Sequence, residues 1–113
     1  MQMEAATNGR VLSAEDIEIR PGEFVALVRG RPLSLTVREL ELLTALVQRR
    51  DRIVGREELY LAVWGEPYRQ SDRSVDVYIA RLRQKLEEEV PDRAFIHTHF
   101  GFGYRFAPQH PAG

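Results

Sequence analysis

The sequence predicts an α+β domain in which a small antiparallel sheet precedes three helices and a C-terminal β-hairpin. Three observations support this order. Short apolar segments separated by proline and glycine fill residues 11–35, apolar residues at helical spacing fill residues 36–90, and β-branched and aromatic residues interrupted by two glycines fill residues 95–106. A chain of 113 residues has room for one such domain.

The expected domain covers residues 11–107. Residues 1–10 are small and polar and are interpreted as a tail or a linker remnant, and residues 108–113 as a C-terminal tail. No apolar run approaches the ~18 residues that cross a membrane, and the N-terminus lacks the apolar stretch of a secretory signal. We therefore expect a cytoplasmic protein with no membrane partner.

The composition excludes several kinds of chemistry. The chain contains no cysteine, so it has no disulfide, thiolate metal site or cysteine nucleophile. It has no glycine-rich phosphate-binding loop and no nucleophile beside an evident base. We expect no catalytic residue, cofactor, metal or small-molecule ligand, and hence not an enzyme.

The N-terminal segments predict an antiparallel meander with tight turns. The turns fall at residues 20–23 (Arg-Pro-Gly-Glu) and 29–32 (Arg-Gly-Arg-Pro), which contain the proline and glycine typical of such positions. The apolar pieces that form the strands are expected around residues 11–12, 17–19, 24–28 and 33–35.

Two helices are expected next. The first begins at Thr36, which forms a capping-box pattern with Glu39. Its apolar face consists of Leu40, Leu43 and Val47, with Leu42 and Leu46 beside it. The second helix is expected between Gly55 and Gly65. Its inward-facing residues would be Leu59, Ala62 and Val63.

The third helix, between Asp72 and Pro91, carries the functional argument. At ~100° per residue its apolar side chains fall on one narrow stripe. This stripe consists of Val75, Ile79, Leu82 and Leu86. The opposite face consists of Arg73, Val77, Arg81 and Gln84. Residues 69–85 contain five basic and two acidic side chains, a net charge of +3, although the whole chain has a net charge of −1.

The outward face of this helix suits the major groove of DNA, which is about 12 Å wide and admits one α-helix. Arg81 could donate two hydrogen bonds to a guanine edge, and Val77 could meet a thymine methyl group. An ordinary solvated basic helix accounts equally well for the charge alone. The exposed valine in line with Arg81, and the hairpin that follows the helix, favour DNA.

Four segments of the chain also match a known pattern in order and spacing. They are LSLTVRELELLTALV, RIVGREELYLAVWG, SDRSVDVYIARLRQKLE and GFGYRF. With them, most of the chain from about residue 11 to residue 106 resembles the OmpR/PhoB-type winged helix-turn-helix effector domain of bacterial two-component response regulators.

The resemblance implies a transcriptional regulator of a phosphorelay that binds double-stranded DNA sequence-specifically. A four-stranded N-terminal sheet would support three helices, the third helix would enter the major groove, and the hairpin would form a wing near the minor groove. Arg81 and Val77 would contact bases. The residues expected at the DNA backbone are Trp64, Arg73, Ser74, Tyr78, Arg83, Lys85, Thr98 and Tyr104.

The resemblance also implies partners besides DNA. The loop after the second helix would face RNA polymerase, and its residues are Glu66, Pro67, Tyr68, Arg69 and Gln70. Two copies of the domain would lie head to tail on direct repeats. The alternative function is a winged-helix protein-interaction module with weak or lost DNA binding, because the net charge is −1 and two positions depart from the family pattern.

The two departures both remove positive charge from the expected DNA face. Phe100, beside His99 at the expected wing tip, stands where the family usually has an arginine. Ala80 stands where a second basic residue often precedes Arg81. We therefore expect weaker binding to the DNA backbone than in the family.

Several aromatic or imidazole positions have more than one interpretation. Trp64 could be a core residue rather than a phosphate contact, and so could Tyr104. Phe100 could pack on Phe102, or it could be an apolar wedge in the minor groove. His97 and His99 lie on one face of a predicted strand, but a metal pair would lack a third ligand.

Overall fold

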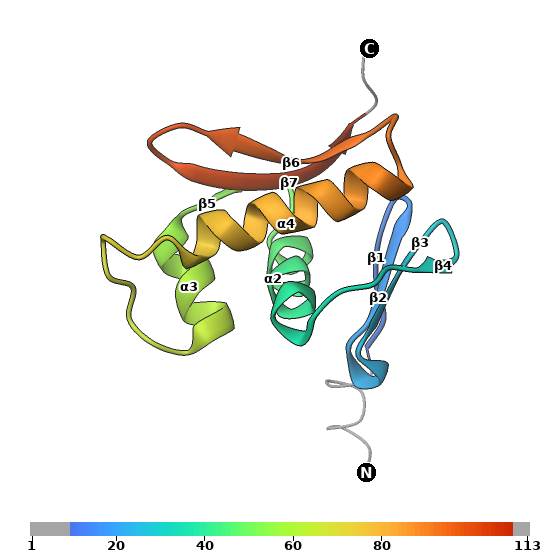
Figure 1. Cartoon of the computed structure of the whole chain (residues 1–113), viewed down its shortest axis with the longest axis horizontal. Coiled ribbons are helices and arrows are strands. Elements are labelled where there is room, and N and C mark those ends of the chain that lie inside the picture. The colour runs from blue at the N-terminus through green and yellow to red at the C-terminus, as the bar shows by residue number, and fades with distance from the viewer. Residues whose placement is uncertain (1–9, 110–113) are drawn as a thin grey trace.

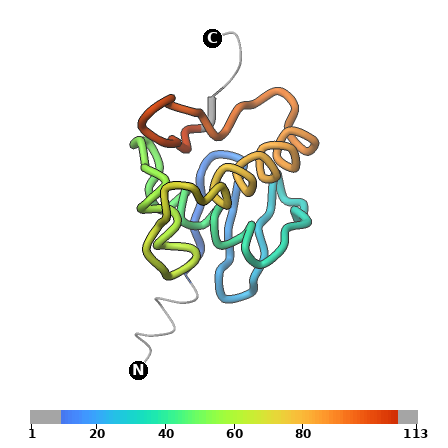
Figure 2. The backbone as a smooth tube through the Cα atoms, turned by 60° about the vertical axis from the view of Figure 1, so that its left-hand side comes forward, coloured from blue at the N-terminus to red at the C-terminus, as the bar shows by residue number. Residues whose placement is uncertain are grey.

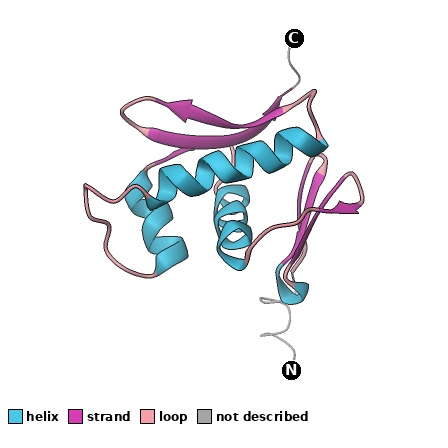
Figure 3. Cartoon of the chain, viewed as in Figure 1, coloured by secondary structure: helices cyan, strands magenta, loops and turns pink. Residues whose placement is uncertain are grey.

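Two antiparallel sheets flank three helices in the computed structural model, which describes residues 10–109 (Figures 1 and 3). The elements are β1 (Leu12–Ala14), β2 (Ile17–Arg20), the 3-10 turn η1 (Pro21–Glu23), β3 (Val25–Val28), β4 (Arg31–Pro32), α2 (Val37–Gln48), β5 (Ile53–Val54), α3 (Arg56–Trp64), α4 (Ser74–Glu89), β6 (Ala94–His99) and β7 (Gly103–Gln109). This is the predicted winged helix-turn-helix order, and the fold prediction is confirmed.

The N-terminal sheet has the strand order β1-β2-β3-β4, with every pair antiparallel. Its last strand differs from the prediction, because β4 covers Arg31 and Pro32 rather than residues 33–35. Leu33 still donates its N–H to the carbonyl of Ala26 at 2.8 Å. Its side chain is buried in the core, so the chain turns from the sheet toward α2 at this point.

The helices form the centre of the core. The capping box predicted at the start of α2 is confirmed, because Thr36 Oγ1 accepts from the N–H of Glu39 and Glu39 accepts from the N–H of Thr36. Leu42, Leu43 and Leu46 of α2 are fully buried. The expectation for Ala62 is wrong: it is exposed, and α3 buries Leu59, Tyr60 and Val63 instead.

The C-terminal hairpin joins β5 in a second sheet of order β5-β7-β6 and lies above all three helices (Figure 2). Its second strand continues to Gln109, two residues past the boundary expected at residue 107. Gly103 permits a close approach to β5, since a Cβ atom there would lie 2.0 Å from the carbonyl oxygen of Val54. Among residues 10–109, no helix combines the length and hydropathy needed to cross a bilayer.

Candidate nucleic-acid interface

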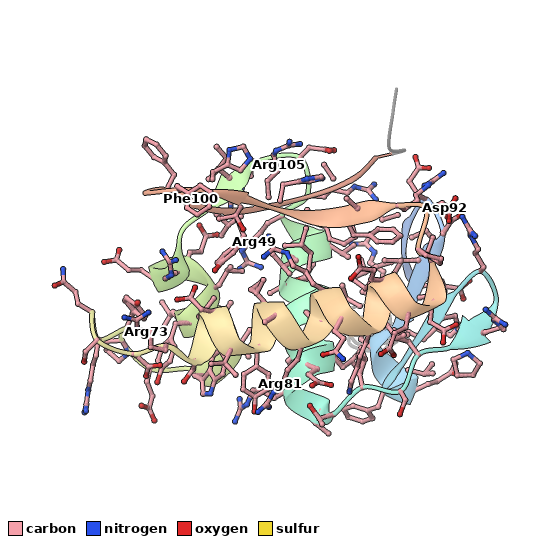
Figure 4. The ribbon with its side chains drawn as sticks, turned by 45° about the horizontal axis from the view of Figure 1, so that its top comes forward. Arg49, Arg73, Arg81, Asp92, Phe100 and Arg105 are labelled. Atoms are coloured by element: carbon pink, nitrogen blue, oxygen red, sulfur yellow. The ribbon has the colours of Figure 1, made fainter. Side chains whose placement is uncertain are left out.

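The two faces of α4 separate as predicted. Val75, Ile79, Leu82 and Leu86 are at most 2% exposed and pack in the core. Val77 is 44% exposed, and Arg73 and Arg81 are exposed with it. Figure 4 shows Arg73 beside the first turn of α4 and Arg81 on the side of the helix that faces away from the hairpin. The outward face is therefore open to a partner over three turns of the helix.

Arg81 is held in place by an aromatic side chain. Its guanidinium carbon lies 4.9 Å from the centre of the Tyr78 ring, a cation–π arrangement. Tyr78 in turn meets the Trp64 ring edge-on at 5.4 Å. These contacts restrict the rotamers of Arg81 while leaving its N–H groups directed to solvent.

Trp64 has the packing of a core residue and also a donor that could reach a phosphate group, the two interpretations that the sequence left open. Its ring is half-buried, stacks on Tyr60 at 5.0 Å, and lies 5.3 Å from the guanidinium of Arg38. Its indole N–H makes no hydrogen bond within residues 10–109. Trp64 is thus a packed residue with a donor available at the surface.

The start of α4 combines a carboxylate that accepts from the helix backbone with an exposed cation at the N-cap position, Arg73. Asp72 Oδ1 accepts from the N–H of Ser74 at 2.7 Å, and the hydrogen bonds from Ser74 lower the pKa of this carboxyl group. The Arg73 side chain is exposed and donates no hydrogen bond within the described part of the chain, and its charge is among the causes that lower the pKa of Asp76. Helix N-termini with a nearby cation are suited to phosphate groups.

Tyr104 has the environment of a core residue, one of the two interpretations that the sequence left open, because its hydroxyl bonds within the protein. The side chain is 5% exposed, and its hydroxyl donates a hydrogen bond to Asp76. Asp76 also accepts from Arg56 Nε at 2.7 Å. Burial by itself raises the pKa of Asp76, but the hydrogen bonds from Tyr104 and Arg56 outweigh it and lower that pKa. Burial and the carboxylate both raise the pKa of Tyr104.

Arg83 and Thr98 also turn toward the protein rather than to solvent. Arg83 Nη2 donates to Thr98 Oγ1 at 2.5 Å and to the carbonyl of Ile96 at 3.1 Å. The guanidinium lies 5.6 Å from the centre of the Tyr104 ring. These bonds attach β6 to α4, so both residues position the wing.

Lys85 is likewise bound inside the domain. Its Nζ lies 2.7 Å from Glu39 Oε1, and the Glu39 side chain is only 3% exposed. The ammonium group therefore neutralises a buried carboxylate on α2. Lys85 is therefore a half-buried cation whose charge is paired with a core carboxylate.

The wing tip exposes two aromatic rings. Phe100 is 88% and Phe102 74% exposed, and the expected packing of Phe100 on Phe102 is wrong, since no ring contact joins these two described residues. His99 Nε2 accepts from Arg105 Nε at 3.2 Å, and His97 Nε2 lies 2.8 Å from the carbonyl of Ala107. Residues 10–109 hold no group of three His, Asp or Glu side chains placed to bind a metal ion.

The loop between α3 and α4 has one anchored residue. Tyr68 is half-buried, meets the Tyr60 ring edge-on at 5.6 Å, and donates its hydroxyl to the carbonyl of Asp72 at 3.1 Å. Of the residues predicted to face RNA polymerase, the other four are exposed: Glu66, Pro67, Arg69 and Gln70. The loop therefore presents a polar surface at the end of the molecule where α4 begins.

Sequence reasoning missed the contribution of Arg56. Its guanidinium binds Asp76 and lies 5.5 Å from the centre of the Tyr104 ring, so it links α3, α4 and β7. No spacing rule connects residues 56, 76 and 104. The available signal was an acid inside the otherwise basic stretch that begins α4, which needs a cationic partner.

Comparison with known protein families shows which family this chain belongs to. The family model described as "Transcriptional regulatory protein, C terminal" matches residues 30–106. The chain belongs to this family. It is a sequence-specific DNA-binding domain of the OmpR/PhoB response-regulator type, a family of transcriptional regulators rather than of known enzymes.

Individual relatives agree with this assignment. The uncharacterized transcriptional regulatory protein YclJ of Bacillus subtilis is 43% identical over 104 residues, which cover 91% of this chain and 45% of YclJ. The chain thus spans about half the length of this relative.

Solved structures show the same fold. The DNA-binding domain of CpxR from E. coli is 32% identical with a TM-score of 0.76, and the match covers 86% of this chain and 95% of that one. The DNA-binding domain of Klebsiella pneumoniae RstA, solved in complex with the RstA box, is 31% identical with a TM-score of 0.77, covering 87% and 97%.

Proposed function

We propose that this chain acts as the DNA-binding half of a longer response regulator, with α4 in the major groove and Val77 and Arg81 against base edges. The observation that carries the proposal is the outward face of α4, where Arg73, Val77 and Arg81 are exposed beside a fully buried opposite stripe. An arginine held by Tyr78 with its donors free suits a guanine edge, and an exposed valine suits a thymine methyl group.

The DNA backbone would be held by a smaller set of residues than the sequence suggests. Arg73 and Ser74 lie at the start of α4, and Trp64 and Tyr78 lie beside Arg81. The four remaining candidates, Arg83, Lys85, Thr98 and Tyr104, support these contacts from inside the domain. Phosphate contacts of the first group would fix the register of the helix in the groove.

The family pattern supplies the expected arrangement of two copies on DNA and the expected protein partner. A second copy would bind head to tail on a direct repeat, and the loop with Glu66, Pro67, Arg69 and Gln70 would face RNA polymerase while Tyr68 anchors it. The protein would act in the cytoplasm, where a phosphorelay signal reaching the rest of the regulator controls DNA binding. The length of YclJ, about twice that of this chain, supports a further domain in the natural protein.

Substitution of Arg81 tests the proposal. Selection of bound sequences from a random duplex pool gives the target of the unmodified chain. On that target, Arg81→Ala should weaken binding by about 1–3 kcal/mol and relax the preference at one base position, because one bidentate contact is lost.

Arg20→Ala is the matched control, since Arg20 lies on the N-terminal sheet and pairs with Glu18. It should leave affinity and preference unchanged. If Arg81→Ala weakened binding equally on every sequence, Arg81 would be a phosphate contact. If the unmodified chain selected no sequence, the protein-interaction alternative would replace the proposal.

A further inference from the structure

We propose that the wing of this domain contacts the minor groove through an apolar wedge, with Phe100 and Phe102 inserted against the sugars and base steps. This inference rests on the proposed function and deepens it, because it assigns the way in which the wing recognises DNA. The two rings are the most exposed large apolar side chains of residues 10–109, at 88% and 74%.

The exposure of both rings calls for a partner. Burial of a phenylalanine side chain is favourable, yet neither ring packs on the other or on the core. Single exposed apolar residues are common, but here two exposed rings flank Gly101 in one turn at the end of the hairpin. The turn itself is closed by a hydrogen bond from the Phe102 N–H to the His99 carbonyl at 2.8 Å.

The wing is mounted firmly below its tip. Gly103 lies against the Val54 carbonyl of β5, and Arg83 attaches β6 to α4 through Ile96 and Thr98. Tyr104 attaches β7 to Asp76 of α4. A partner that accepts the two rings therefore orders little additional backbone, which lowers the entropic cost of inserting them.

The charge of the hairpin favours DNA as the partner. Residues 94–107 contain one arginine and no acidic residue, so nothing on the hairpin repels phosphate groups. Arg105 lies opposite His97 on the hairpin and donates to His99, which precedes the turn (Figure 4). Figure 1 places the tip at the same end of the molecule as the first turns of α4, so both elements can meet one duplex.

The dimensions of the groove determine how the wing could enter. The minor groove is about 6 Å wide, too narrow for a two-stranded ribbon but open to a flat ring. Apolar side chains used in this way unstack base steps and bend the duplex, most easily at pyrimidine–purine steps. The wing would thus select flexible DNA without forming a hydrogen bond to a base.

The test uses the full chain and the duplex that it selects, with 2-aminopurine placed in turn at steps flanking the major-groove contact. Phe100→Ala should weaken binding by about tenfold, in keeping with aromatic–base stacking, without changing the slope of log K against log salt. The unmodified chain should raise 2-aminopurine fluorescence at one step, and Phe100→Ala and Phe102→Ala should reduce that rise. Phe100→Arg should steepen the salt slope by about one unit, because it adds a cation.

Phe24→Ala is the matched control, because Phe24 is 73% exposed on the N-terminal turn next to an acidic residue. It should bind as the unmodified chain does. If Phe100→Ala and Phe102→Ala also bound unchanged while Arg81→Ala lost base preference, the wedge would be overturned and the proposed function would stand. If Arg81→Ala also had no effect on base preference, the proposed function itself would fail.

Discussion

Arg81 and Arg83 lie two residues apart on α4 and have opposite roles. Arg81 stacks on Tyr78 and keeps its donors at the surface, whereas Arg83 donates to Ile96 and Thr98 of the wing. The difference comes from the helical rotation between them, which turns Arg83 toward β6. Residue type therefore does not decide whether a cation on this helix serves DNA or the protein.

Gly103 is the residue whose substitution should damage the domain most. A Cβ atom there would overlap the Val54 carbonyl at 2.0 Å, and the backbone φ of 141° is one that other residues rarely adopt. Gly103→Ala should lower the free energy of unfolding by about 2–4 kcal/mol, measured by urea denaturation.

Gly101 provides the control for this prediction, since it lies in the same turn with a φ of 85° and no atom within 4 Å of an added Cβ. Gly101→Ala should destabilise by only about 1–2 kcal/mol through backbone strain. Equal losses at the two positions would show that close packing against β5 does not limit the wing.

At the scale of elements, one carboxylate joins two helices. Glu39 completes the capping box of α2 and binds Lys85 of α4 at 2.7 Å. Lys85→Met should lower the free energy of unfolding by about 2–4 kcal/mol, because it leaves a buried carboxylate without its cation. The double variant Glu39→Gln, Lys85→Met should be more stable than Lys85→Met alone. If the losses in the free energy of unfolding of the two single variants simply added in the double variant, the result would contradict the pairing.

The same pair gives the stability a pH dependence. Burial by itself raises the pKa of Glu39, but the hydrogen bonds from Lys85 and Thr36 outweigh it and lower that pKa in the folded state. The stabilisation is therefore complete above the unfolded value of about 4.3 and is lost as the pH falls through the folded pKa. When urea denaturation is repeated toward roughly pH 3, Glu39→Gln should lose less stability than the unmodified chain. An identical loss in the two proteins would show that Glu39 does not cause the pH dependence.

For the whole molecule, attraction to DNA must be local, because the net charge is −1. Lys85, Arg83 and Arg56 are each paired with groups of the domain, so they are less available than Arg73 to displace counterions. Arg73→Ala should reduce the slope of log K against log salt by about one unit, measured by titrations at several salt concentrations. If Arg73→Ala had the same salt slope as Arg20→Ala, Arg73 would not be a phosphate contact.

The sequence predicted the order of elements and both faces of α4, because these depend on local periodicity and capping. It did not predict that Tyr104, Arg83 and Lys85 face the protein, since their partners Asp76, Ile96 and Glu39 are brought to them by tertiary folding. The exposure of Phe100 was one of two alternatives at the sequence level. It depends on how the turn directs each ring, which composition does not specify.

The central claim is that the outward face of α4 lies against base pairs, and an NMR titration of the chain with its selected duplex tests it most directly. We expect the largest changes at the Val77 methyl groups and the Arg81 side chain, with smaller changes at Arg73 and Phe100 and almost none across β1–β4. Changes centred on the N-terminal sheet, with Val77 and Arg81 unaffected, would contradict the account.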